Sequence, residues 1–270
     1  MSGRAVALCL RAAAPPTERG AGAADPAAAA LRAAVAAVTD LADTLEAAVD
    51  SATTLALAPA VAAALPEDVV IALRGQEARG TLEVCMTPAT DAWLPGLGPG
   101  GLRAQVGIGA AAHRRRLARQ PLGLWPRDLA VPPHLCDDVW PLGVRWVLAA
   151  PAALALGRPA LPGATVAFHP RGVALLAACP FGADDADAAP GGPAPLIVLC
   201  ADIGDAAAAR QRAGALDAEP ITPSRYLARA PRHPMCEPAA LAGVDAAARG
   251  PFAGPGLPML RALRQLEAAL

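Results

Sequence analysis

The spacing of apolar residues changes along the chain between two periods, which predicts a mixture of strands and helices. The first run, Arg4–Leu10, is short and almost continuously apolar, as in a strand buried on both faces. After the loop-like stretch Ala12–Ala24, Asp25 and Pro26 form an N-cap and first-turn signal. The apolar residues that follow recur every three or four positions, which predicts a helix with one buried stripe. They are Leu31, Val35, Val38, Leu41, Leu45 and Val49.

The rest of the chain repeats this alternation. Short apolar runs that predict strands span residues 68–73, 82–86, 122–125, 144–149, 165–168, 173–178 and 196–201. Helical patterns cover residues 53–64, 102–119, 206–216, 238–248 and 257–270, and the Gly- and Pro-rich residues 181–195 predict a loop. In the helix 102–119 the basic residues, His113 among them, fall mostly on the polar side. Strands that alternate with helices predict an α/β fold with a parallel sheet, either open or closed into a barrel.

Composition narrows the possible partners. The 270 residues suffice for one large domain or two small ones. The formal net charge is -1, from 23 basic and 24 acidic residues, so no general attraction to nucleic acid or to an anionic membrane is expected. Aromatic residues make up only 3% of the chain and Ala is abundant, which predicts a core of Leu, Val and Ala.

The cysteines and the apolar runs indicate a reduced, cytoplasmic protein. The six cysteines are scattered, and three of them sit inside apolar, strand-like runs, where free Cys behaves as a small hydrophobe. The N-terminal apolar run is interrupted by Arg11 and lacks the features of a signal peptide. No stretch reaches the roughly 18 apolar residues that a membrane-spanning helix needs.

Several common chemistries find little support in the sequence. The run 96–101 satisfies GxGxxG, but it does not clearly follow a strand and Pro99 interrupts it, which argues against a dinucleotide site. The chain contains no Lys, which excludes a P-loop, and no Ser lies in a nucleophile-elbow context. Residues 134–138 offer metal-binding side chains without a second group at zinc spacing. We therefore expect neither a metal nor a cofactor.

Residues 81–148 carry a series of short motifs in a defined order. They are Leu82-Glu83-Val84, Ala89-Thr90-Asp91, Leu94-Pro95, Leu102-Arg103-Ala104-Gln105, His113-Arg114-Arg115, Gly123-Leu124-Trp125-Pro126-Arg127-Asp128 and Gly143-Val144-Arg145-Trp146. Two further motifs lie downstream, the apolar run Leu196–Asp202 and the segment Ile221–Leu227. Their order and spacing resemble the catalytic barrel of glycoside hydrolase family 57, the family of α-amylases and α-glucan branching enzymes. The resemblance implies an incomplete or distorted (β/α) barrel over residues 1–230, with a helical segment, residues 231–270, packed on it.

The resemblance also implies a retaining glycosidase site, in which one carboxyl group is the nucleophile and another is the acid/base. Asp128 aligns with the family's nucleophile and Asp202 with its acid/base. The remaining residues at substrate-binding positions are Glu83, Asp91, Trp93, Trp125 and Trp146. Each has a structural alternative: Asp128 as a turn residue, Asp202 as a cap of the helix that starts near Ala206, Glu83 as a salt-bridge partner, and the Trp residues as core.

Several family residues are replaced in this chain. The His-x-His of the first strand corresponds to Arg11-Ala12-Ala13, and Thr-His corresponds to Thr90-Asp91. The nucleophile is Asp rather than Glu, and Gly204 stands where a Glu normally follows the acid/base. Two functions therefore compete: an enzyme that acts on α-glucans, and a non-catalytic protein that binds a glucan or a partner or has a structural role. A gene product without a selected function is a third reading, and an oligomer is compatible with all three.

Overall fold

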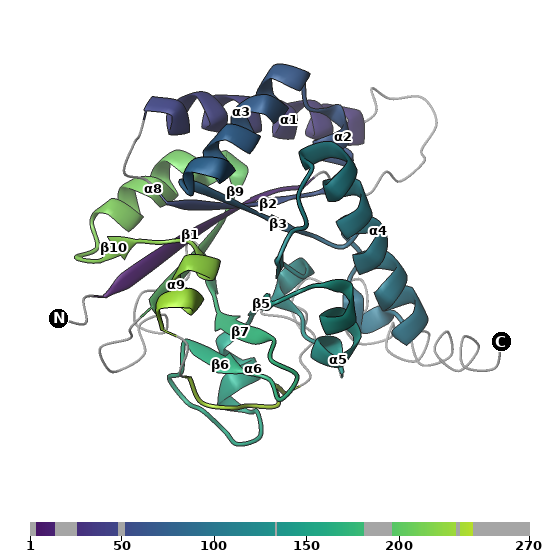
Figure 1. Cartoon of the computed structure of the whole chain (residues 1–270), viewed down its shortest axis with the longest axis vertical. Helices are drawn as coiled ribbons and strands as arrows, with labels where there is room; N and C mark the ends of the chain where they lie inside the picture. Colours follow the sequence, from purple (N-terminus) through teal and green to yellow (C-terminus); the bar gives the residue numbers. More distant parts are fainter. Residues whose placement is uncertain are drawn as a thin grey trace.

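The computed structural model describes residues 4–13, 26–47, 52–132, 134–180, 196–230 and 233–239. Within them, one mixed sheet curves into a nearly closed barrel with helices around its outside (Figure 1). Its strands are β1 (Ala5–Ala12), β2 (Thr53–Leu57), β3 (Leu82–Met86), β4 (Gly123–Leu124), β5 (Trp146–Ala149), β6 (Val166–Phe168), β7 (Ala174–Ala177), β8 (Cys179–Pro180), β9 (Leu196–Asp202) and β10 (Glu219–Pro220).

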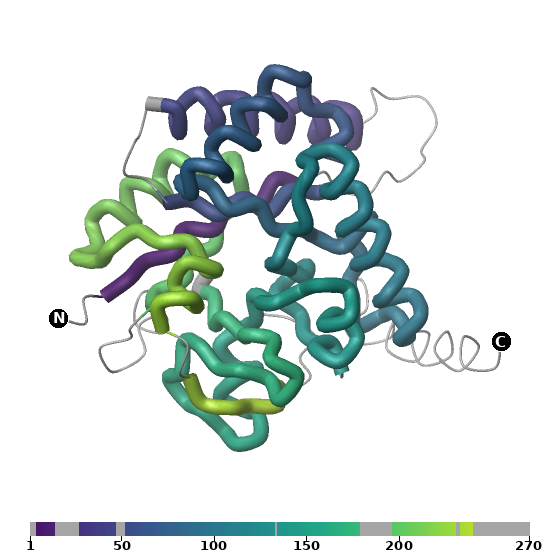
Figure 2. Tube along the Cα trace, viewed as in Figure 1, coloured from purple at the N-terminus to yellow at the C-terminus, as the bar shows by residue number. Residues whose placement is uncertain are grey.

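The helices alternate with these strands, as the sequence pattern predicts. The α-helices are α1 (Pro26–Ala47), α2 (Pro59–Ala64), α3 (Glu67–Arg79), α4 (Pro99–Leu117), α5 (Leu135–Val139), α6 (Pro151–Ala155), α8 (Ala206–Gly214) and α9 (Pro223–Arg229). The short 3-10 helices are η1 (Leu94–Gly96), η2 (Arg127–Leu129), η3 (Trp140–Leu142) and η4 (Ile203–Asp205). In the trace of Figure 2, α1, α2 and α3 lie together over one flank of the sheet, and the β6–β7 region lies at the opposite end.

The order of the strands explains how the barrel nearly closes. The sheet runs β6-β7-β5-β4-β3-β2-β1-β9-β8, with β10 paired to β1. Neighbouring strands are parallel except for the antiparallel pair β6–β7. Strands β7 and β8 follow each other directly in the chain, yet β7 pairs with β5 and β8 pairs with β9. This one segment therefore joins the two sides of the sheet, and the seam of the barrel lies where the pairing changes. The expected incomplete (β/α) barrel is confirmed.

Alternation along the strands separates an inner from an outer core. On β1, Val6, Leu8 and Leu10 pack outward in the cluster that contains the apolar stripe of α1. Ala5, Ala7 and Cys9 belong instead to the cluster inside the barrel, together with Trp146 and Trp125. The same period of two places Arg11 on the inner face, at the carboxyl end of β1.

Two of the sequence predictions are wrong, and both fall between residues 53 and 79. Residues 53–64 were expected to be one helix, but Thr53–Leu57 form β2, because β1 and β3 pair with it on both sides. Residues 68–73 were expected to be a strand, but they lie in α3. That helix starts after Pro66, carries Glu67 and Asp68 in its first turn, and ends at Gly80 with a left-handed φ of 75°. The helices expected at 238–248 and 257–270 and the loop at 181–195 lie outside the described residues, apart from residues 238 and 239.

His113 is a third correction, because it does not lie on the polar side of α4. Its side chain is 1% exposed, and its Nε2 lies 2.8 Å from the carbonyl oxygen of Leu57 at the end of β2. Its Nδ1 is buried and has no hydrogen-bond partner within the described ranges. Burial lowers the pKa of His113 to about 4. The neighbouring Arg116 also turns inward and donates to the carbonyl groups of Ala62 and Leu65.

The buried His113 predicts a loss of stability in acid. The unfolded chain takes up a proton at this residue near its usual pKa of 6.5, whereas the folded protein does so near 4. The free energy of unfolding should therefore fall by about 3 kcal/mol as the pH drops through this window. Urea unfolding at pH 7 and pH 4 measures it, with His113→Gln as a variant that retains a hydrogen-bond donor but does not titrate. An equal loss in both proteins would contradict the assignment.

Candidate functional site

The carboxyl ends of four strands bring five charged residues to one edge of the barrel. We call this set the barrel mouth: Arg11, Asp91, Arg127, Asp128 and Asp202. Arg11 lies near the end of β1 and is the register partner of Asp202 on β9. Asp91 follows β3, and Arg127 and Asp128 follow β4. In parallel barrels this edge carries the functional groups, so the topology brings together three of the residues that the sequence predicted.

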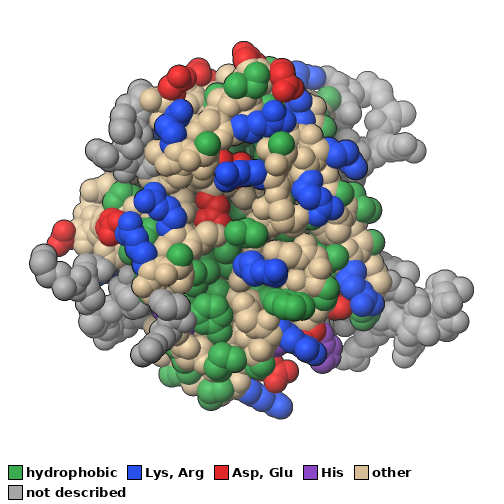
Figure 3. All heavy atoms as spheres, in the orientation of Figure 1, with side chains coloured by type: hydrophobic (Ala, Val, Ile, Leu, Met, Phe, Trp, Pro, Cys, Tyr) green, Lys and Arg blue, Asp and Glu red, His purple; other side chains and the backbone are tan. Residues whose placement is uncertain are grey.

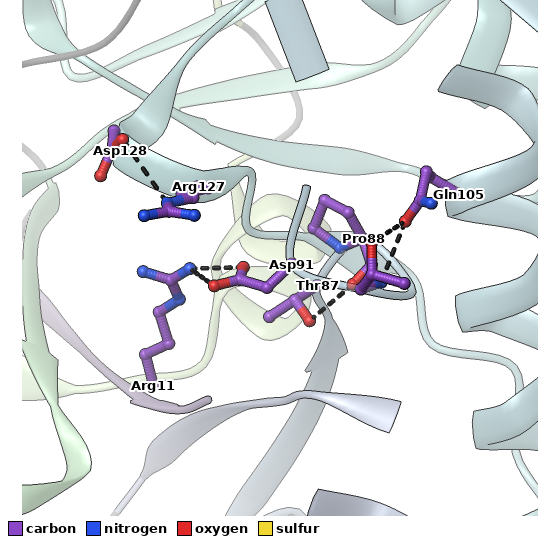
Figure 4. A network of polar contacts seen from close by, with 8 residues as sticks. Arg11, Thr87, Pro88, Asp91, Gln105, Arg127 and Asp128 are labelled. Carbon is purple, nitrogen blue, oxygen red and sulfur yellow. Dashed lines mark hydrogen bonds and ion pairs between the residues drawn. The ribbon is translucent and has the colours of Figure 1, made fainter. Parts of the chain in front are cut away.

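The most buried pair at the mouth is Arg11 with Asp91. One guanidinium nitrogen of Arg11, Nη2, lies 2.5 and 2.6 Å from the two carboxylate oxygens of Asp91, and the side chains are 14% and 10% exposed (Figure 4). Burial raises the pKa of Asp91, and the positive charges of Arg11 and Arg127 oppose that rise. No sequence pattern predicts this pair, since 80 residues separate its members. The period of β1 does indicate that residue 11 points inward.

The loop that carries Asp91 is held by α4. The side-chain oxygen of Gln105 accepts hydrogen bonds from the backbone N–H of Thr90, at 2.9 Å, and from its hydroxyl, at 3.2 Å. The backbone carbonyl of Gln105 accepts from the N–H of Ala89 at 3.0 Å. Helix α4 can approach this closely because Gly109 has no side chain: a Cβ there would lie 2.9 Å from the carbonyl oxygen of Thr87. Gln105 therefore positions the loop that carries Asp91.

Asp128 occupies a strained turn directly after β4. Its φ is 56° and that of Leu129 is 54°, so two consecutive residues other than glycine adopt the left-handed conformation. Such backbone strain is concentrated at functional sites. The Asp128 side chain is 45% exposed, and its Oδ2 lies 3.8 Å from Nε of Arg127. In Figure 4 the carboxylate of Asp128 lies beyond Arg127 as seen from Asp91.

Asp202 ends β9 and is exposed. It stands at the N-cap position of η4, but its side chain makes no capping hydrogen bond. The structural alternative of a capping side chain therefore has no support here, and the carboxylate remains accessible. Counted strand by strand around the barrel, β9 is the fourth neighbour of β4 on the side of β1. On the side of the seam, with the β7–β8 segment counted once, it is the third. Asp128 and Asp202 thus belong to opposite sides of the mouth.

Glu83 and Trp146 lie at the other edge of the barrel, where β3 and β5 begin. Trp146 is fully buried, and its indole N–H lies 2.9 Å from Oε1 of Glu83 and 3.1 Å from Oγ of Ser224. The backbone N–H of Ser224, in the first turn of α9, donates to Oε2 of Glu83 at 3.0 Å. Both carboxylate oxygens of Glu83 are therefore engaged in joining β5 and α9 to the barrel. Neither residue therefore belongs to the barrel mouth.

The two other Trp residues that were predicted to bind substrate, Trp93 and Trp125, lie closer to the mouth. Trp125 follows β4, is 6% exposed and packs in the inner core, and its backbone N–H donates to the carbonyl of Met86 at 2.8 Å. Trp93 is half-buried, two residues after Asp91. Of the two, only Trp93 is partly exposed.

The described part of the chain offers no preformed metal centre. It contains no group of three or more His, Cys, Asp or Glu side chains arranged to hold a metal ion. None of its helices combines the length and apolarity needed to cross a membrane. On the face seen in Figure 3, Arg side chains are scattered singly rather than gathered into one basic patch.

No protein-family model and no curated protein sequence matches the chain. Solved structures do match it. The family 57-type branching enzyme from Pyrococcus horikoshii superposes with a TM-score of 0.73 at 13% identity, over 99% of this chain and 78% of that one. The α-amylase AmyC from Thermotoga maritima gives 0.70 at 12% identity, over 92% and 79% of the two chains. The 4-α-glucanotransferase from Thermococcus litoralis gives 0.67 at 12% identity, over 89% and 42%. The chain therefore has the fold of the glycoside hydrolase family 57 barrels, as its motifs predict.

Proposed function

We propose that the protein binds an α-glucan across the barrel mouth and acts on it by retaining chemistry. In this proposal Asp128 is the nucleophile and Asp202 the acid/base. Asp202 protonates the glycosidic oxygen while a carboxylate oxygen of Asp128 bonds to the anomeric carbon and the glycosidic bond breaks. Asp202 then takes a proton from water or from an acceptor hydroxyl, which displaces Asp128. The enzymes with the same fold, an amylase, a branching enzyme and a glucanotransferase, support this substrate class.

The observation that carries the proposal is the strained, exposed turn at Asp128. The left-handed backbone at residues 128 and 129 costs free energy on the order of 1–3 kcal/mol for each residue, and it presents a carboxylate at the catalytic edge of a barrel. Arg127 places a positive charge beside that carboxylate. Asp202, on the opposite side, is accessible and forms no cap. Retaining chemistry requires the two carboxyl groups to come within about 5–5.5 Å of each other when substrate is bound.

Glucan binding is the first test. Calorimetric titration with maltoheptaose should give saturable binding, and Trp93→Ala should weaken it by about tenfold, because the ring offers a stacking surface beside the mouth. Trp140→Ala is the matched control, since Trp140 is also partly exposed, at 45%, and lies in η3 rather than beside Asp91. Equal affinities in the two variants, or no binding by the wild type, would remove the support for a glucan site at the mouth.

The Arg11–Asp91 ion pair favours a second candidate, a protein that binds glucan without cleaving it. The pair occupies the inner end of β1, where the sequence resemblance places a His-x-His motif. The guanidinium of Arg11 only donates hydrogen bonds, whereas a neutral imidazole both donates and accepts, so the two groups contact a sugar differently. Saturable binding without turnover would select this candidate over the enzyme.

A further inference from the structure

A cavity of about 330 Å³ lies on the flank of the barrel, apart from the mouth. We call it the flank pocket. Four segments supply its wall: the start of α5, the turn after α6, His169 at the end of β6, and residues 237–239. The turn that follows His169 joins β6 to β7 at the edge where β5 begins, so this wall lies away from the carboxyl ends of the strands. None of the five mouth residues takes part in it.

The wall is held by backbone hydrogen bonds, so the pocket is formed before any ligand binds. Arg158 and Glu237 exchange both backbone bonds, at 2.8 and 2.9 Å, as neighbours in a β-bridge. Phe168 is bonded on both sides in the same way, to Pro234 and Cys236, each at 2.8 Å. These contacts fix the last described segment of the chain against β6 and the turn after α6. A preformed concave site of this volume is at the small end of the range for ligand pockets, about 300–1,000 Å³.

The wall presents a hydrogen-bond donor that no described residue uses. His169 is 7% exposed, and its Nδ1 accepts the backbone N–H of Arg171 at 3.2 Å. In the neutral ring the proton therefore lies on Nε2. Burial is the main cause that lowers the pKa of His169, which favours this neutral form. An almost buried side chain thus directs an N–H group at a cavity.

Acceptors and a second donor surround this group. Asp137 is held by Arg171, whose Nε lies 2.7 Å from Oδ1, and this hydrogen bond lowers the pKa of Asp137. Glu237 and Arg158 stand side by side on the β-bridge, and neither side chain has an ion pair within the described ranges. Leu156, 66% exposed, lies at the rim as an apolar surface. The pocket therefore combines donors and acceptors with an apolar wall and carries no large net charge.

We propose that the flank pocket is a second ligand site, which binds one or two rings of a neutral saccharide. Sugar hydroxyl groups both donate and accept, so they match a wall with His169 and Arg158 as donors and with Asp137 and Glu237 as acceptors. The C–H face of a ring fits the apolar surface at Leu156. An inorganic anion fits poorly, because two carboxylates line the cavity. A metal ion fits poorly as well, since no ligand cluster of three exists among the described residues. This site goes beyond the proposed function and does not depend on it.

Hydrogen–deuterium exchange with maltose at millimolar concentration tests the proposal, since it reports where the sugar binds. Maltose should slow exchange in the segments 134–139, 156–158 and 235–239. Glu237→Gln and His169→Ala should raise the maltose concentration for half-protection about tenfold, because the first removes the charge of an acceptor and the second removes a buried donor to a hydroxyl. Asp138→Asn, next to Asp137 but not in the wall, should leave it unchanged.

Two further arms separate the outcomes. Asp128→Ala should leave the maltose-dependent protection at the flank pocket unchanged. A loss of function at the mouth can therefore be told apart from a loss of binding at the pocket. Inorganic phosphate should give no protection at these segments. Protection by phosphate alone, no protection by maltose, or protection that Glu237→Gln and His169→Ala do not weaken would each overturn the proposal. Thermal melts confirm that each variant is folded.

Discussion

Trp146→Ala is expected to lower the free energy of unfolding by about 3–5 kcal/mol. Trp146 is among the largest fully buried side chains, and it fills the amino-terminal end of the barrel interior. Its removal leaves a cavity and also takes away the indole donor of Glu83. Trp146→Phe, which keeps most of the volume, should cost about 1 kcal/mol, because the partly buried carboxylate of Glu83 then loses one hydrogen bond and keeps the one from the Ser224 hydroxyl. Urea denaturation monitored by circular dichroism measures both.

Gly123 provides an independent test of the same packing. A Cβ at this position would lie 2.0 Å from the Trp146 ring, so Gly123→Ala should also destabilise strongly in the wild-type background. In a Trp146→Ala background the added methyl group has room, and most of that cost should disappear. Trp140→Ala, at a position that is 45% exposed and where the ring contacts the Arg145 guanidinium, should cost only about 1 kcal/mol. A cost for Trp146→Ala close to that of Trp140→Ala would show that the barrel interior is not packed as described.

Asp128→Ala and Asp202→Ala are each expected to reduce the rate on an α-glucan by about a thousandfold or more. The first removes the nucleophile and the second the proton donor, so neither loss should be recovered by more substrate. Asp205→Ala is the matched control, since Asp205 is exposed and lies three residues beyond Asp202. Release of reducing ends from maltoheptaose and formation of new branch points give the rates.

Azide distinguishes the two roles. In Asp128→Ala, azide can attack the anomeric carbon from the face that the carboxylate leaves free, which yields a β-glycosyl azide. In Asp202→Ala the glycosyl-enzyme still forms from an activated substrate, and azide displaces Asp128 to give the α-product. The same azide anomer from both variants would contradict the assigned roles, and full activity in either variant would exclude that residue from the chemistry.

Secondary structure was predictable where one signal dominated. The strand β3 and the helix that begins at Pro26 follow directly from apolar runs and periodicity. Residues 53–57 were mispredicted because they were merged with the helix that follows, although Pro59 marks the first turn of that helix. Thr53–Leu57 is too short to show its period, and only pairing with β1 and β3 makes it a strand. In α3 the acidic first turn after Pro66 was a stronger signal than the apolar pair Val69 and Val70.

The candidate site was predictable in its strand ends but not in its pairings. Asp128 and Asp202 follow apolar strands, and a parallel sheet brings such residues to one edge. The ion pair of Arg11 with Asp91 joins β1 to the loop after β3 across the intervening β2, and local sequence does not encode this tertiary contact. Glu83 was placed in the site by its motif, although it is the second residue of its strand. That position predicts the opposite, stabilising edge, where the structure has it.

Proton NMR of the wild-type protein acting on maltoheptaose tests the central claim most directly, because it detects turnover and the configuration of the first products together. A retaining α-glucan enzyme at the barrel mouth predicts new α-anomeric signals before mutarotation, and their loss in Asp128→Ala. New β-anomers, or no new reducing ends or linkages from a folded sample, would contradict retaining chemistry at Asp128 and Asp202.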